Sequence, residues 1–112
     1  MLEKLILGLT VNHAKLELDD LPGSPVEIAG KLNVAFDSHR QWETISQAGK
    51  DDQIVLHAIR RTKLFGFVDD VRIELSSDQD GQTRLYASSR SRVGKGDLGQ
   101  NARNLQQMKA WL

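Results

Sequence analysis

Hydrophobic residues recur at two different spacings along the chain, and each spacing predicts a different kind of element. Ile28, Leu32 and Phe36 follow one another at intervals of four residues, as on one face of a helix. Just before them, residues 24–27 combine a capping serine, a proline at the first helical position and a glutamate three residues after the cap. We therefore predict a helix over residues 25–39.

Beyond residue 41 the hydrophobic spacing falls to two, which is typical of strands. Strands are predicted over residues 42–47, 53–61, 67–76 and 83–92. Short links between successive strands favour an antiparallel meander. Asp97 is then the predicted N-cap of a second helix. The hydrophobic face of that helix carries Leu98, Ala102, Leu105, Met108 and Leu112.

The last two strands can be aligned by matching their faces. Placing Leu75 opposite Leu85 brings hydrophobic side chains together, and a shift by one residue would break this match. The same alignment sets Asp70 opposite Arg90, and opposite charges attract across a ladder. Both observations support one register for this hairpin.

The N-terminal segment leaves an alternative open. Two β-like runs, at residues 4–11 and 14–20, favour a hairpin, whereas a helix is the alternative for residues 2–9. The whole chain is predicted to be one α+β domain over residues 1–112, with a four-stranded antiparallel sheet and both helices on one face. A hairpin within residues 1–23, if formed, would add edge strands.

Composition narrows the classes of partner and chemistry. Fifteen basic and fifteen acidic side chains cancel, so neither nucleic acid nor an anionic membrane is an expected partner. The absence of cysteine excludes disulfides and thiol chemistry. The three histidines are scattered and no cofactor motif occurs, so no metal and no cofactor is expected. The hydrophobic run at residues 5–9 is too short for a signal peptide, which favours a cytoplasmic protein.

Two segments carry a resemblance to a known family: HAIRRTKLFGFVDDV at residues 57–71 and SSRSRVGKGDLGQNAR at residues 88–103. They are similar to the family called domain of unknown function 1499, over about residues 24–112. The resemblance implies a fold but no established reaction. This chain lacks the Pro-Asn-Cys-Val-Ser-Ser-like segment that the family usually has before the first helix, so a role for that cysteine does not carry over. The family's basic run after Asn101 is reduced here to Arg103.

Polar residues gather where the predicted meander brings strand ends together. The candidate site residues are Arg61, Asp69, Asp70, Arg92, Asp97 and Asn101. Asp69 stands out because it shares the core face with Val71, and a buried carboxylate needs a charged or hydrogen-bonding partner. The expected partners of Asp69 are Arg61 on the neighbouring strand and backbone amides near residues 94–97.

Two functions of different classes are compatible with this cluster. The preferred hypothesis is a non-catalytic binding or interaction module, in which the cluster is a structural clamp that fastens the second helix to the sheet. A site for a small anionic ligand is the alternative interpretation of the same cluster. The alternative is a small hydrolase or isomerase acting on an anionic or polyhydroxylated small molecule; no catalytic residue is assigned. The outer sheet face suits either a two-fold homodimer or a solvated surface. It carries Val68, Arg72, Glu74 and Tyr86.

Overall fold

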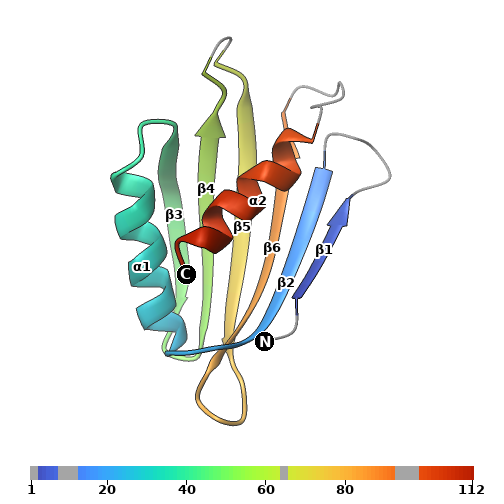
Figure 1. Ribbon diagram of the computed structural model, residues 1–112. Coiled ribbons are helices and arrows are strands. Elements are labelled where there is room, and N and C mark those ends of the chain that lie inside the picture. Colours follow the sequence, from blue (N-terminus) through green and yellow to red (C-terminus); the bar gives the residue numbers. More distant parts are fainter. Residues whose placement is uncertain (1–2, 8–12, 64–65, 93–98) are drawn as a thin grey trace.

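The computed structural model describes residues 3–7, 13–63, 66–92 and 99–112. In these residues, one antiparallel sheet of six strands carries both helices on the same face (Figure 1). The elements are β1 (Glu3–Leu7), β2 (His13–Leu21), α1 (Pro25–Asp37), β3 (Trp42–Lys50), β4 (Gln53–Arg61), β5 (Val68–Ser77), β6 (Thr83–Ser91) and α2 (Gln100–Ala110). The α+β class is confirmed, and the sheet is wider than the predicted four strands.

The strand order is β1-β2-β6-β5-β4-β3. The four predicted strands form the meander from β3 to β6, and the N-terminal hairpin β1–β2 joins it through pairing of β2 with β6. Of the two structures predicted for the N-terminal segment, the hairpin is the one observed, because residues 3–7 form strand β1 and are not helical. The predicted register of the last hairpin is confirmed, with Leu75 opposite Leu85 and Asp70 opposite Arg90.

Helix α1 begins at the predicted N-cap, Ser24, whereas Glu27 contacts the Ser24 hydroxyl and not the second backbone N–H of a capping box. The Glu27 backbone N–H donates to Ser24 Oγ at 3.2 Å, and Ser24 Oγ donates to Glu27 Oε1 at 3.3 Å. The helix ends at Asp37, two residues before the predicted boundary. Ser38 Oγ donates to the Val34 carbonyl at 2.8 Å, and the same carbonyl accepts from the Ser38 backbone N–H at 3.1 Å.

The core lies between the sheet and the two helices. Alternate residues of β2, β4, β5 and β6 are buried there, as period-two patterning requires. An aromatic cluster of Phe36, Trp42 and Trp111 joins the C-terminal ends of both helices to β3. The rings of Phe36 and Trp42 stack with centroids 4.9 Å apart, and Trp111 meets them edge-on at 5.7 and 5.4 Å.

Helix α2 starts later than predicted. The expected N-cap, Asp97, lies outside the described residues, and the helix follows Gly99, whose φ of 81° is a left-handed conformation that glycine adopts readily. The buried residues of α2 are Asn101, Asn104, Leu105 and Met108. Neither helix described here is long and apolar enough to span a membrane.

Candidate functional site

Four polar side chains are buried where α2 lies on the sheet. This buried polar cluster consists of Asp69 on β5, Ser89 on β6, and Asn101 and Asn104 on α2, each no more than 2% exposed. Asn104 Nδ2 donates to Asp69 Oδ2 at 2.8 Å and to Ser89 Oγ at 3.2 Å, and Ser89 Oγ donates to Asn101 Oδ1 at 2.6 Å. These contacts tie the helix to two strands, and they support the clamp hypothesis.

Arg60 lies beside the buried polar cluster. It stands directly opposite Asp69 in the pairing of β4 with β5, and it continues the core-facing series of Leu56 and Ala58. Its Nε is shielded from solvent and has no hydrogen-bond partner in the part of the chain that the structure describes. Burial lowers the pKa of the Arg60 guanidinium; attraction to Asp69 opposes this shift, and repulsion by Arg103 adds to it. Arg60 is therefore a partly desolvated cation whose Nε donates to no described residue.

Arg61 does not pair with Asp69 as predicted, because successive residues of a strand point to opposite faces. Arg61 projects on the outer face of the sheet, where its Nη1 donates to Glu43 Oε1 at 3.0 Å. Both side chains of this pair are about half exposed, so the contact stabilises the fold little. The expected role of Arg61 beside Asp69 falls to Arg60.

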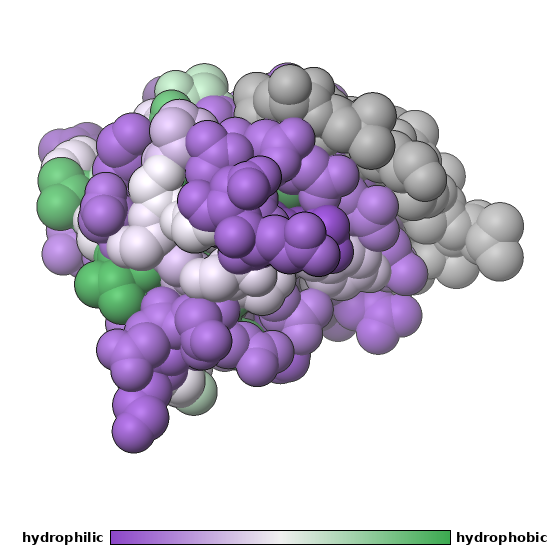
Figure 2. Space-filling view, turned by 90° about the horizontal axis from the view of Figure 1, so that it is seen from below, coloured by the Kyte–Doolittle hydropathy of each residue, from purple (hydrophilic) through white to green (hydrophobic). Residues whose placement is uncertain are grey.

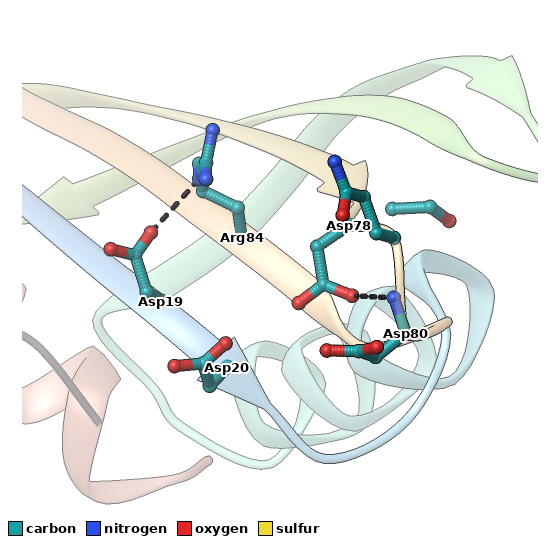
Figure 3. Close-up of a pocket in the computed structure, with 7 residues that line it drawn as sticks. Asp19, Asp20, Asp78, Asp80 and Arg84 are labelled. Atoms are coloured by element: carbon teal, nitrogen blue, oxygen red, sulfur yellow. Dashed lines mark hydrogen bonds and ion pairs between the residues drawn. The ribbon is translucent and has the colours of Figure 1, made fainter.

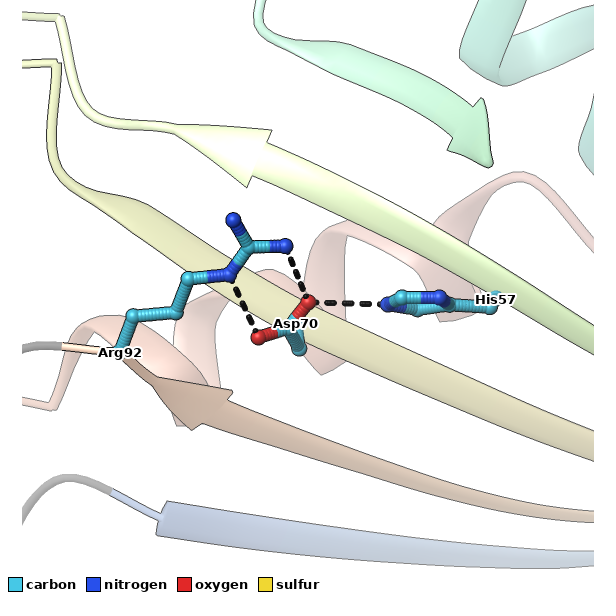
Figure 4. Close-up of polar contacts among 3 residues, drawn as sticks. All are labelled: His57, Asp70 and Arg92. Atoms are coloured by element: carbon cyan, nitrogen blue, oxygen red, sulfur yellow. Dashed lines mark hydrogen bonds and ion pairs between the residues drawn. The ribbon is translucent and has the colours of Figure 1, made fainter. Parts of the chain in front are cut away.

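Asp70 and Arg92 do come together, but on the outer face of the sheet. Arg92 holds Asp70 through two hydrogen bonds of 2.9 Å, from Nε and Nη2, while His57 Nε2 lies 2.9 Å from Asp70 Oδ1 (Figure 4). The Arg92 hydrogen bond lowers the pKa of the Asp70 carboxyl, with a further contribution from His57, and burial opposes the shift. An ionised Asp70 makes His57 Nε2 the donor, which leaves Nδ1 of a neutral ring as an acceptor. The sheet therefore separates the described candidate residues. Asp69 and Asn101 are buried on the side of α2, and the outer face carries Arg61, Asp70 and Arg92.

The lowered pKa of Asp70 predicts a specific pH dependence of stability. The stabilisation from ionised Asp70 is present above the ordinary carboxyl pKa of about 3.9, and it is lost as the pH falls through the lowered value. The wild-type protein should therefore be more stable than Asp70→Asn near pH 6, and this difference should shrink on acidification. Urea denaturation of both proteins at a series of pH values tests this. A difference that is constant or larger at low pH would contradict the assignment.

Charges are segregated between the two ends of the sheet, although the net charge is zero. The end where β4 and β6 finish and β5 begins, hereafter the basic end, carries Arg40, Arg60, Arg61, Lys63, Arg90, Arg92 and Arg103. Its described acidic residues are Asp37, Glu43, Asp69 and Asp70. The opposite end, hereafter the acidic end, carries Asp19, Asp20, Asp51, Asp52, Asp78 and Asp80, with Lys50 and Arg84 as its basic residues. Hydrophilic residues cover most of that opposite end (Figure 2).

A pocket of about 430 Å³ opens at the acidic end, between the end of β2 and the β5–β6 loop (Figure 3). Arg84 Nε donates to Asp19 Oδ1 at 2.9 Å, and Asp78 Oδ1 accepts from the Asp80 backbone N–H at 2.8 Å. These carboxylates therefore serve an ion pair and a turn. No group of three histidine, aspartate or glutamate side chains in the described residues is placed to hold a metal ion.

Four described site residues were missed by the sequence analysis: His57, Arg60, Ser89 and Asn104. Arg60 could have been found by counting in twos from Leu56, and Asn104 by its place one residue before the hydrophobic Leu105. No periodicity in the sequence indicates the contact of His57 with Asp70. The two residues are not directly opposite in the ladder, so only side-chain reach joins them.

Comparison with known proteins extends the family resemblance to nearly the whole chain. No curated protein and no solved structure matches it. The model of a family described as a protein of unknown function, DUF1499, matches residues 12–112. The chain therefore belongs to the DUF1499 family.

Proposed function

We propose that the protein is a non-catalytic binding module that takes a small anion at the basic end, with Arg60 as its principal contact. The observation that carries this proposal is the Nε donor of Arg60, which is shielded from solvent and has no hydrogen-bond partner among the described residues. Buried donors are almost always paired, so an unpaired one points to a partner that binds from outside. A guanidinium presents its donors in a planar fork that suits phosphate and carboxylate groups.

The surroundings of Arg60 favour an anion over a neutral ligand. Arg103 lies close enough to repel the Arg60 charge, and an anion between the two guanidinium groups would relieve that repulsion. The Oδ2 atom of Asp69, the carboxylate beside Arg60, already accepts from Asn104. The segregation of charge adds a longer-range attraction, because a local positive field steers anions even when the net charge is zero.

The environments of the two carboxylates, Asp69 and Asp70, argue against the alternative function of a hydrolase or isomerase. Asp70 has both oxygens engaged, by Arg92 and His57, and its lowered pKa makes it a weak proton acceptor. Asp69 is buried beneath α2 and accepts from Asn104. Neither carboxylate is therefore placed for acid–base catalysis on a bound substrate.

The proposal is tested by titrating inorganic phosphate and pyrophosphate into the protein by calorimetry at low salt. Arg60→Met should weaken binding of the anion by about tenfold or more, because one charge-assisted hydrogen bond contributes about 1.5–3 kcal/mol. Arg61→Met is the matched control, since it removes the same charge one residue away on the opposite face. Wild-type protein that binds neither anion, or Arg60→Met protein that binds like the control, would contradict the proposal.

A further inference from the structure

Helix α1 carries a stripe of uncharged residues on the side that faces away from the sheet. Val26, Gly30 and Val34 follow one another at intervals of four, whereas Ile28, Ala29, Leu32 and Phe36 are buried against the sheet. Val26 is 53% exposed and Val34 67% exposed, more than any other valine described. A surface helix normally places charged and polar residues there. The outer stripe of α1 is therefore an unpartnered apolar face.

Gly30, at the centre of the stripe, has no role in the packing of its own chain. A Cβ built at this position would meet nothing within 4 Å, and the backbone is not in the left-handed region. Glycine and valine are both poorer helix formers than alanine, so the stripe weakens the helix at three positions. Glycine on a helix surface does allow a second backbone to approach closely, and flanking valines then supply the packing.

We propose that the outer stripe of α1 packs against the same stripe of a second copy of this chain, antiparallel, about a two-fold axis near Gly30. This arrangement places each Val26 against Val34 of the partner subunit, so the contact is self-complementary. The charged residues beside the stripe also favour the antiparallel arrangement. Glu27 and Lys31 lie along the same flank of the stripe, and antiparallel pairing sets Glu27 beside Lys31 of the partner subunit. A parallel two-fold pair would place these flanks on opposite sides of the contact, so Glu27 and Lys31 of the two subunits would not meet.

The size of the stripe sets the expected strength of the dimer. A helix of 13 residues is about 20 Å long, so a contact between two such helices lies at the small end of protein interfaces. We expect a dissociation constant on the order of 100 µM, with monomers at low micromolar concentration. Hydrophobic residues reach the surface mainly on the side of the molecule where α1 lies, in a view otherwise dominated by hydrophilic ones (Figure 2).

Sedimentation equilibrium of the full chain from about 10 µM to 1 mM tests the proposal. Wild-type protein should approach the mass of a dimer as the concentration rises, and Gly30→Ala and Val34→Lys should each weaken association by at least about tenfold. Gly30→Ala is informative because the added methyl group meets nothing in the monomer and alanine favours the helix. Unfolding therefore cannot account for a loss of association in this variant.

The control is Phe67→Lys, which removes a similarly exposed hydrophobic residue, 49% exposed, between β4 and β5. It should associate like the wild type. Lys31→Glu should weaken association, because it sets two glutamates side by side across the two-fold axis. Wild-type protein that is monomeric at 1 mM would overturn the proposal. Association that is unchanged in Gly30→Ala and Val34→Lys would overturn it as well, and would move the contact to another surface such as the outer sheet face.

Discussion

Asp69→Ala is expected to lower the free energy of unfolding by about 3–5 kcal/mol, as the loss of one partner from a buried charged contact does. The variant would leave the Asn104 amide without its acceptor and Arg60 without its neighbouring carboxylate, both in a region shielded from solvent. Each loss is destabilising, because an unpaired buried polar group has given up its water without replacement. Guanidinium chloride denaturation at pH 7 measures the change.

Two further variants separate the clamp from a ligand site. Asp70→Ala removes the neighbouring carboxylate on the half-exposed outer face, so it should destabilise far less than Asp69→Ala. Combining Asp69→Ala with Arg60→Met should recover part of the loss, because the second change removes the stranded charge. If Asp69→Ala were as stable as the wild type, the carboxylate would not be a structural partner, and Asp69 would itself become a candidate ligand contact.

Phe36→Ala is expected to destabilise the protein by about 3–5 kcal/mol. Phe36 is fully buried and its ring contacts both tryptophans of the chain, so truncation leaves a cavity at the point where α1, β3 and the end of α2 meet. Packing around that cavity cannot collapse easily, because the two indole rings belong to different elements. Tryptophan fluorescence during urea denaturation reports this region directly.

Phe67→Ala is the matched control for the aromatic cluster, since it deletes the same phenyl group from a position about half exposed to solvent. Its effect should stay within about 0.5 kcal/mol, as for most surface substitutions. If Phe36→Ala and Phe67→Ala destabilised equally, the aromatic cluster would contribute no more than a surface side chain, and its role in holding the helices would be wrong.

The fold was largely predictable because its signals are local. The Ser24 cap satisfies a backbone donor of its own helix terminus, and the register of β5 with β6 follows from which faces are apolar. Strand β4 was predicted with its observed bounds, whereas β3 runs to Lys50, three residues beyond its predicted end. The full width of the sheet was harder to predict, because pairing of β2 with β6 joins segments that are distant in the chain.

The candidate site was predictable only in part. Asp69 was identified from its place on an otherwise apolar strand face, and the structure does bury it. The choice of Arg61 over Arg60 was wrong by one residue, which is enough to move a side chain to the opposite face of a sheet. Contacts of His57 and Asn104 depend on how far each side chain reaches across neighbouring elements, and backbone periodicity carries no information on that reach.

Strand β2 pairs with β6, which lies several tens of residues later in the chain. This separation in sequence affects the order in which the sheet can form. The hairpins from β3 to β6 close short loops and can form early, whereas joining β2 to β6 closes one long loop at a greater entropic cost. During synthesis β2 therefore leaves the ribosome well before its neighbour exists. Until β6 arrives, the N-terminal hairpin has an unpaired edge, and unpaired edges favour aggregation. The rate of this last closure is expected to limit how fast the sheet is completed.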